Sequence, residues 1–142
     1  KNKRGKQLQD ELYNYFKEKA AISLLRNKVF PREQFSKVKG TGSMNYKQGA
    51  YRYAFFADLY NGSSWKINTI KIEVDIYSKR DRKLLVTRRI GRKLGMYKGL
   101  PYTKVELPFL GKGDPPDLPF LETAYQTYEW RITEIRGEPK NN

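Results

Sequence analysis

Apolar residues recur every four positions near the start of the chain. Between residues 6 and 27 these positions are Leu8, Leu12, Phe16, Ala20 and Leu24. A four-residue spacing places side chains on one face of an α-helix, and Pro31 ends the pattern a few residues later. The sequence therefore predicts an N-terminal amphipathic α-helix over residues 6–27.

The helix has two possible roles, and the charge of its polar face distinguishes them. In the first, the helix lies on a membrane or a partner; in the second, it packs against its own domain. Asp10, Glu11, Lys17 and Glu18 give the polar face both signs of charge, whereas the polar face of a membrane-surface helix is rich in cations. The mixed charge favours packing against the domain that follows.

From residue 50 onward, apolar positions alternate with polar ones instead. The apolar positions of the clearest example are Ile70, Ile72, Val74 and Ile76. A period of two is that of a half-buried β-strand. Similar patterns predict strands at residues 51–60, 84–90, 102–107 and 127–132, with turns of Gly, Pro, Asn and Ser between them. Several short strands separated by such turns indicate an antiparallel β-sandwich or barrel.

These patterns divide the chain into four segments. Residues 1–30 form a basic N-terminal segment that contains the amphipathic helix. Residues 31–48 are predicted to be a linker because they contain one proline and several glycines. Residues 49–139 form the β-sandwich domain, and residues 140–142 form a short tail.

Four pieces of the predicted domain form a pattern of strands and polar turns. These pieces are Leu59-Tyr60-Asn61, the strand from Ile70 to Tyr77, Leu84-Leu85-Val86 and Trp130-Arg131-Ile132. Together they resemble the FxLYD-type and related immunoglobulin-like modules of bacterial cell-envelope proteins. The chain departs from that pattern in having Val74 where the family name has Phe and Ser78 where it has Asp. The resemblance implies an immunoglobulin-like antiparallel β-sandwich that is not catalytic and typically lies outside the cytoplasm.

Composition narrows the chemistry open to the chain. Its 142 residues include no cysteine and no histidine. Disulfides, thiolate nucleophiles and histidine-based general bases are therefore absent. Asp114, Asp117 and Glu122 lie near prolines in a Gly/Pro-rich loop, without the spacing of an EF-hand, which favours a solvated loop over a metal site. We predict no enzyme activity, no cofactor and no bound metal, although hydrolysis by carboxylates alone stays open.

The net charge of +14 is concentrated in two places. Residues 1–48 have a net charge of +8, residues 79–98 have another +8, and the remaining residues sum to −2. Within the second region, the proposed partner-binding residues are Lys79, Arg80, Arg82, Lys83, Arg88, Arg89, Arg92 and Lys93. If residues 76–89 form a hairpin, its tip and outward faces are expected to present six of these cations together: Arg80, Arg82, Arg88, Arg89, Arg92 and Lys93.

Such a surface fits several anionic partners. The leading hypothesis is an acidic protein surface or an anionic membrane. The alternative is nucleic acid, with Tyr97 and Tyr102 as an aromatic platform for bases; no small-molecule substrate is evident. A competing interpretation without a partner is a charged strand edge that discourages aggregation.

Three further sites have a structural and a functional interpretation. Trp65 and Trp130 lie in phase with apolar neighbours, which favours packing over ligand binding. The triplet Asn61-Gly62-Ser63 matches the acceptor pattern for N-glycosylation. Short triplets also occur by chance, so both interpretations of Asn61 stay open.

Together these features predict a non-enzymatic binding or accessory module of a membrane-associated or envelope protein. The alternative is a nucleic-acid-binding β-barrel protein. Four of the first six residues are basic. Either a signal peptide or membrane anchor preceded Lys1, or the opening is a solvated basic terminus, and both interpretations stay open. The extracytoplasmic side is favoured by the resemblance, but basic residues beside an anchor favour the cytoplasmic face, which therefore stays open.

Overall fold

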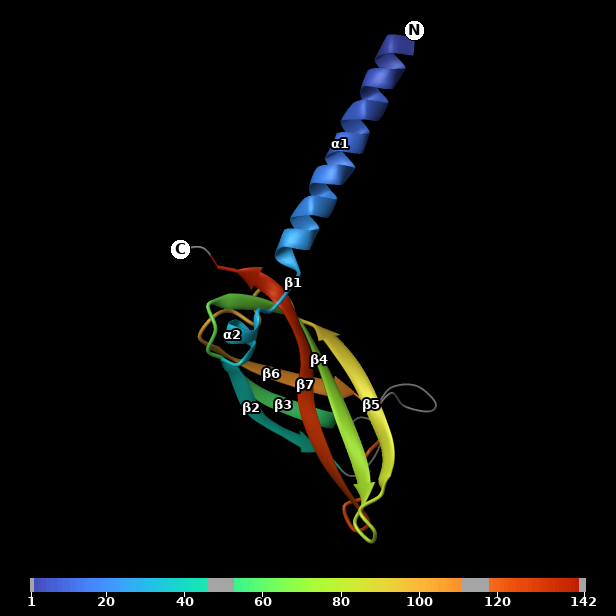
Figure 1. Cartoon of the computed structure of the whole chain (residues 1–142), viewed down its shortest axis with the longest axis vertical. Helices are drawn as coiled ribbons and strands as arrows, with labels where there is room; N and C mark the ends of the chain where they lie inside the picture. Colours follow the sequence, from blue (N-terminus) through green and yellow to red (C-terminus); the bar gives the residue numbers. More distant parts are fainter. Residues whose placement is uncertain (1, 46–52, 111–117, 141–142) are drawn as a thin grey trace.

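A long helix projects from a β-rich body (Figure 1). The computed structural model describes residues 2–45, 53–110 and 118–140. Helix α1 (Asn2–Arg26) confirms the predicted helix. Its row of apolar side chains does not pack on the body, because Leu8, Leu12 and Phe16 are each 56–60% exposed. The expectation that this face packs on its own domain is therefore wrong for the part of α1 whose side chains are described.

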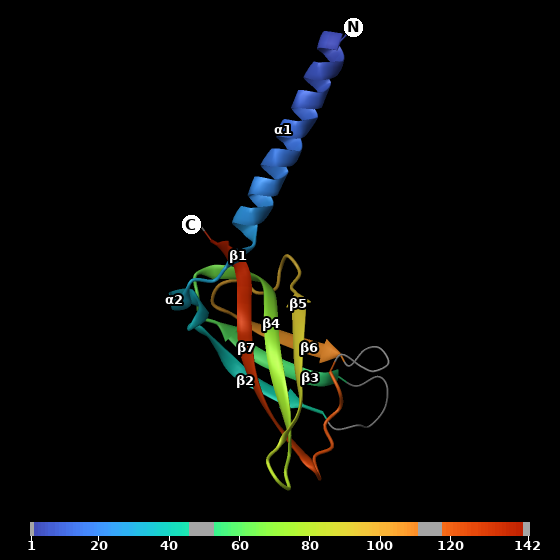
Figure 2. The ribbon, with the colours of Figure 1, turned by 45° about the vertical axis from the view of Figure 1, so that its right-hand side comes forward.

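Within the described residues, seven strands form two antiparallel sheets (Figures 1 and 2). The first sheet has the order β1-β7-β4-β5, with β1 (Lys28–Val29), β7 (Gln126–Pro139), β4 (Trp65–Ser78) and β5 (Leu84–Lys93). The second has the order β2-β3-β6, with β2 (Val38–Met44), β3 (Tyr53–Asn61) and β6 (Thr103–Leu110). A single helical turn, α2 (Arg32–Phe35), lies between β1 and β2.

The core lies between the inner faces of the two sheets. The alternating residues Ile70, Ile72, Val74 and Ile76 of β4 are buried, as predicted. The ring centroid of Phe55 on β3 lies 5.2 Å from that of Trp130 on β7, which joins the two sheets. Trp65 packs in the same way on Phe30 at 5.2 Å. The packing role predicted for both tryptophans is confirmed.

Part of the predicted linker is a strand. Residues 38–44 form β2, which pairs with β3 from Val38 opposite Asn61 to Met44 opposite Phe55. Its glycines serve close packing: a Cβ on Gly40 would lie 2.1 Å from the Asp58 carbonyl oxygen, and one on Gly42 would lie 2.4 Å from the Phe55 ring. Glycine in a strand often marks such a close approach. The body of the protein therefore begins before residue 49.

Two strands extend beyond the positions at which the sequence predicted their ends. β6 continues through Pro108 to Leu110, past the end predicted at residue 107. It is the outer strand of its sheet, where proline costs no hydrogen bond to a further strand. β7 continues past Gly137 to Pro139. The lengthened β7 is what brings β1 and Phe30 onto the first sheet.

Removing α1 is expected to leave the body folded. The described side chains of α1 over residues 4–18 are exposed, so they contribute no burial to the core. A chain beginning at Asn27 should melt cooperatively, with a Tm within about 3 °C of that of the full chain. Near-ultraviolet circular dichroism during heating measures this. Loss of the cooperative transition would show instead that α1 supports the body.

Candidate binding surface

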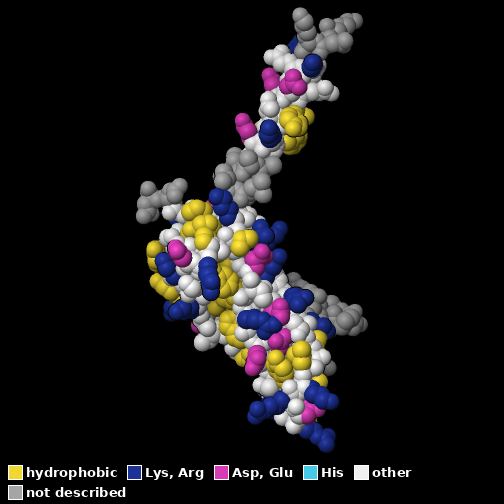
Figure 3. Space-filling view, in the orientation of Figure 1, with side chains coloured by type: hydrophobic (Ala, Val, Ile, Leu, Met, Phe, Trp, Pro, Cys, Tyr) yellow, Lys and Arg dark blue, Asp and Glu magenta, His cyan; other side chains and the backbone are white. Residues whose placement is uncertain are grey.

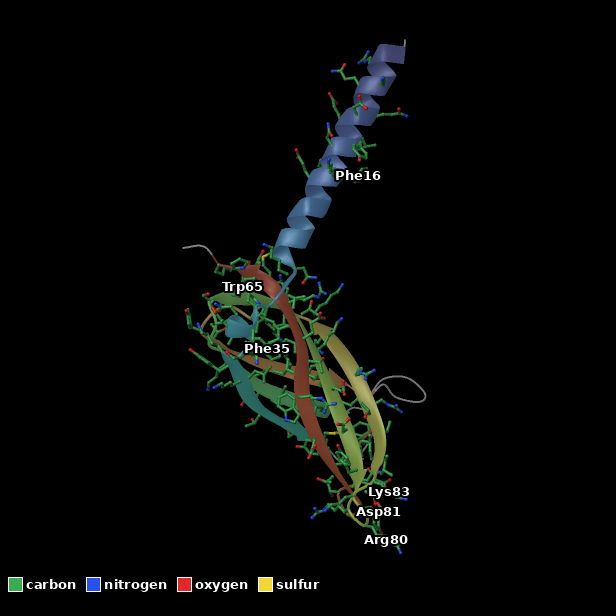
Figure 4. All side chains as sticks on the ribbon, in the orientation of Figure 1. Phe16, Phe35, Trp65, Arg80, Asp81 and Lys83 are labelled. Atoms are coloured by element: carbon green, nitrogen blue, oxygen red, sulfur yellow. The ribbon has the colours of Figure 1, made fainter. Side chains whose placement is uncertain are left out.

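The hairpin between β4 and β5 closes with a turn that uses its one acidic residue internally. The Lys83 amide donates to Asp81 Oδ1 at 3.1 Å, and the Arg82 amide donates to the Ser78 carbonyl at 2.9 Å. Arg82 has a φ of +58°, the left-handed region. The side chains of Arg80, Arg82 and Lys83 are left exposed at the end of the body opposite α1 (Figure 4).

Exposed apolar side chains lie beside these cations. Leu84 and Leu85 are 53% and 52% exposed, and Tyr125 is 73% exposed. The Lys79 amide donates to the Tyr125 carbonyl at 2.9 Å, which holds Tyr125 against the hairpin. We call residues 79–85 together with Tyr125 the distal tip. Figure 3 shows Lys and Arg side chains gathered at this end of the molecule.

The leucines of the distal tip were not among the residues for which the sequence predicted a role. Two consecutive leucines directly follow a cationic turn. In a strand of period two, neighbouring side chains point to opposite faces, so at least one of the two faces away from the core. The Leu84-Leu85 doublet was therefore the sequence signal that could have predicted an exposed apolar side chain beside the cations.

The remaining predicted cations do not share one face. Arg88 lies opposite Val74 and Arg92 lies opposite Ile70, so both are on the inner side of the sheet. Arg92 Nη1 donates to the Pro108 carbonyl at 2.7 Å and thereby links the two sheets. Arg89 lies on the outer side, together with the exposed Lys93. The expectation that the hairpin presents its six named cations together is therefore wrong, because strand alternation separates them.

Arg89 belongs to a network of charged side chains on the outer face of the first sheet. Its Nε lies 3.0 Å from Glu73 Oε2. Arg131 contacts Glu73 as well and places Nη1 at 2.9 Å from Asp75 Oδ2. Thr87 donates to Asp75 Oδ1 at 2.6 Å. Because its charge is matched locally by Glu73, Arg89 is a weaker candidate for a partner contact than the cations of the distal tip.

These contacts lower the pKa of both acids. The hydrogen bond from Arg89 is the main cause for Glu73. For Asp75 the largest cause is the hydrogen bond from Arg131, followed by the one from Thr87. Each donor stabilises the ionised carboxylate, so the proton is lost at a lower pH than usual.

The same network is expected to make stability depend on acidity. A lowered folded-state pKa contributes stability above the ordinary values of 4.5 for Glu73 and 3.8 for Asp75. This contribution is lost as the pH falls through the lower folded-state values. The urea concentration at the unfolding midpoint of the wild type should therefore decrease as the pH is lowered from about 5 to about 3. In Arg131→Gln this midpoint should change less over the same pH range. If the urea midpoints of the two proteins change equally with pH, these contacts are not the cause of the pH dependence.

The predicted aromatic platform lies at the other end of β5. Tyr97 and Tyr102 are 85% and 63% exposed, and both belong to the connection between β5 and β6. This connection passes over the end of the body from which α1 projects (Figure 2). The ten residues of β5, which span about 30 Å at the usual rise per residue, separate these tyrosines from the distal tip.

Asn61 is an internal structural residue and not an exposed acceptor. Its side chain is completely buried. Its Nδ2 donates to the carbonyls of Trp65 at 2.8 Å and Gly99 at 3.0 Å, and its Oδ1 accepts a hydrogen bond from Ser63 Oγ at 2.6 Å. The folded chain leaves no room for a glycan here, so the glycosylation interpretation of the triplet is wrong for this fold.

The described parts of the chain contain neither a cluster of metal-ligating side chains nor a membrane-spanning helix. Over residues 2–45, 53–110 and 118–140, no group of three or more acidic residues is placed to hold a metal ion. Asp114 and Asp117 lie outside the described residues, and Glu122 is exposed. Among the described helices, none is long and apolar enough to cross a membrane.

Comparison with known proteins gave no matching family model, no matching curated protein and no matching solved structure.

Proposed function

We propose that this chain is a non-enzymatic binding module that docks on an anionic membrane surface through its distal tip. The observation that carries the proposal is the exposure of Leu84 and Leu85 beside Arg80, Arg82 and Lys83 at the free end of the body. Cations attract anionic headgroups, and the leucines reach the acyl boundary.

The energetics of the distal tip suit a lipid surface. A cation near an anionic bilayer contributes about 1 kcal/mol, and full burial of a leucine contributes about 1.5–3 kcal/mol. A stable protein partner generally covers about 800 Å² on each side, which is a broad surface rather than the end of one hairpin. The shape and composition of the distal tip therefore favour a membrane over an acidic protein face.

We also propose a type of fold and a cellular location for the chain. The two sheets would form an immunoglobulin-like sandwich of the FxLYD-type resemblance, within a membrane-associated or envelope protein. The two antiparallel sheets, whose buried apolar residues form one core cluster, support this extension. The extracytoplasmic side is the favoured location.

The nucleic-acid alternative has less support. It needs cations and exposed tyrosines on one surface, but Tyr97 and Tyr102 lie at the opposite end of β5 from Arg80 and Arg82. Arg92, which lies nearer the tyrosines, already donates to the Pro108 carbonyl.

Co-sedimentation with vesicles tests the proposal. We expect the chain to bind vesicles of phosphatidylcholine mixed with phosphatidylserine but not vesicles of phosphatidylcholine alone. Replacing three cations of the distal tip (Arg80→Gln, Arg82→Asn, Lys83→Gln) should weaken binding about 100-fold, given about 1 kcal/mol for each. Asparagine is chosen at residue 82 because it tolerates the left-handed backbone. Leu84→Ser with Leu85→Ser should weaken binding about tenfold or more, because about half of each leucine is exposed and available for burial.

The matched control removes three exposed cations at the other end of the molecule, with Arg4→Gln, Lys6→Gln and Lys17→Gln on α1. This variant should bind anionic vesicles nearly as well as the wild type. Two results would contradict the proposal: no binding of the wild type to anionic vesicles, or a loss of binding in the α1 variant but not in the variants of the distal tip. The second result would place the membrane contact on α1.

A further inference from the structure

The connection between β5 and β6, residues 94–102, is held in one position by buried groups. We call it the rim loop. The Ile67 amide donates to the Gly99 carbonyl at 2.7 Å, and the Tyr102 amide donates to the Asn61 carbonyl at 2.6 Å. The buried Asn61 side chain adds donated bonds to Gly99 at 3.0 Å and Leu100 at 3.2 Å. The backbone of the rim loop is therefore fixed before any partner arrives.

This fixed loop holds large apolar side chains in solvent. Met96 is 75% exposed and Tyr97 is 85% exposed, with the exposed Lys98 next to them. Grouped apolar side chains on a surface often mark an interaction site. A loop that is already ordered also loses less conformational entropy on binding. Both properties are those of a recognition loop.

Two hollows adjoin the rim loop and share Lys98. One, of about 320 Å³, lies between the loop and the end of β5 and is lined by Arg92, Lys93, Leu94, Met96, Tyr97 and Leu107. The other, of about 360 Å³, lies on β6 and is lined by Phe56, Lys104, Val105, Glu106 and Pro108. More of the exposed surface lining both hollows is apolar than polar.

Free cations surround these hollows. Lys93, Lys98 and Lys104 are exposed, and none of them forms a salt bridge with an acid among the described residues. Among the described residues, Glu106 is the one acidic residue that lines either hollow. The charge of the region is therefore complementary to an acidic ligand.

We propose that the rim loop and its two hollows bind an extended acidic peptide segment that also carries apolar side chains. The apolar side chains would occupy the hollows, and the carboxylates would meet the three lysines. β5 and β6 are each the outer strand of their sheet, so their edges can supply backbone hydrogen bonds to an extended chain. Nucleic acid fits less well, because its phosphates would face mainly apolar linings.

Fluorescence anisotropy with the full chain tests this inference. The probe is a short labelled peptide of alternating glutamate and valine, and the control peptide has lysine in place of glutamate. We expect the glutamate peptide to bind and the lysine peptide not to bind. Tyr97→Ser with Lys98→Gln should weaken binding about tenfold or more, as loss of an interface aromatic does. Both side chains are exposed, so this variant should keep the wild-type Tm.

A matched control keeps this result separate from the membrane proposal. The variant that removes Arg80, Arg82 and Lys83 should bind the glutamate peptide as the wild type does, because its changes lie at the other end of β5. The inference is overturned if the wild type does not bind the glutamate peptide at low salt, or if the charge change at the distal tip abolishes binding while Tyr97→Ser with Lys98→Gln does not. It is also overturned if a single-stranded oligonucleotide displaces the peptide and binds more tightly.

Discussion

Asn61→Ala is expected to lower the free energy of unfolding by about 4 kcal/mol, because a net 0.5–1.5 kcal/mol is lost with each hydrogen bond and buried partners are left unpaired. The side chain donates to the carbonyls of Trp65, Gly99 and Leu100 and accepts from Ser63. Its complete burial keeps water from replacing these bonds. Urea unfolding of the wild type and the variant measures the difference.

The control for this prediction is Asn14→Ala on the exposed face of α1. An exposed substitution away from packed groups should change stability by less than about 0.5 kcal/mol. Asn61→Asp should be at least as damaging as Asn61→Ala, because it removes the donating amide and buries a charge. A loss below about 1 kcal/mol for Asn61→Ala would show that the bonds around Asn61 do not hold the rim loop in place.

Gly137→Ala is expected to be the most damaging small substitution in the first sheet. A Cβ there would lie 1.8 Å from the Lys66 carbonyl oxygen and 2.9 Å from the Phe30 ring. The first of these is backbone of the neighbouring strand, so relief requires β4 and β7 to separate. Overpacking usually costs about 1–3 kcal/mol, and a clash with backbone should reach or exceed the upper end. Urea unfolding again measures the effect.

Gly91→Ala is the matched comparison. Gly91 lies in β5 of the same sheet, and a Cβ there would meet Lys71 Cγ at 3.4 Å, at the tight end of van der Waals contact with a flexible side chain. This variant should be neutral or stabilised by up to about 1 kcal/mol, since alanine loses less backbone entropy than glycine on folding. Equal effects at the two glycines would contradict the packing described for β4 and β7.

The strands were predictable where one face is buried and the other is solvated. Ile70, Ile72, Val74 and Ile76 alternate with polar residues, and period two requires no long-range information. β2 was not predictable in the same way, because Gly40 and Gly42 are typical of a flexible segment. Their function here is to admit the backbone of Asp58 and the ring of Phe55, which depends on residues far away in the sequence.

The candidate surface was predictable only in part. Arg88, Ile90 and Arg92 share one parity along β5, so a consistent use of strand alternation places all three on the inner side. The sequence alone was therefore enough to predict that the cations of the basic region lie on two different faces of the sheet. The burial of Asn61 was not, because its partners Gly99 and Leu100 follow it by 38 and 39 residues. The position of α1 was also not predictable, since its mixed charge is compatible with several environments.

The most direct test of the membrane proposal is a site-specific probe of lipid contact. The chain contains no cysteine, so a single introduced cysteine can carry an environment-sensitive fluorophore at one position. Leu85→Cys places it at the distal tip, Tyr97→Cys on the rim loop and Leu12→Cys on α1. On addition of phosphatidylserine-containing vesicles, we predict a blue shift of emission at residue 85 and no change at residues 12 and 97. A shift at residue 12 or 97 without one at residue 85 would contradict the account.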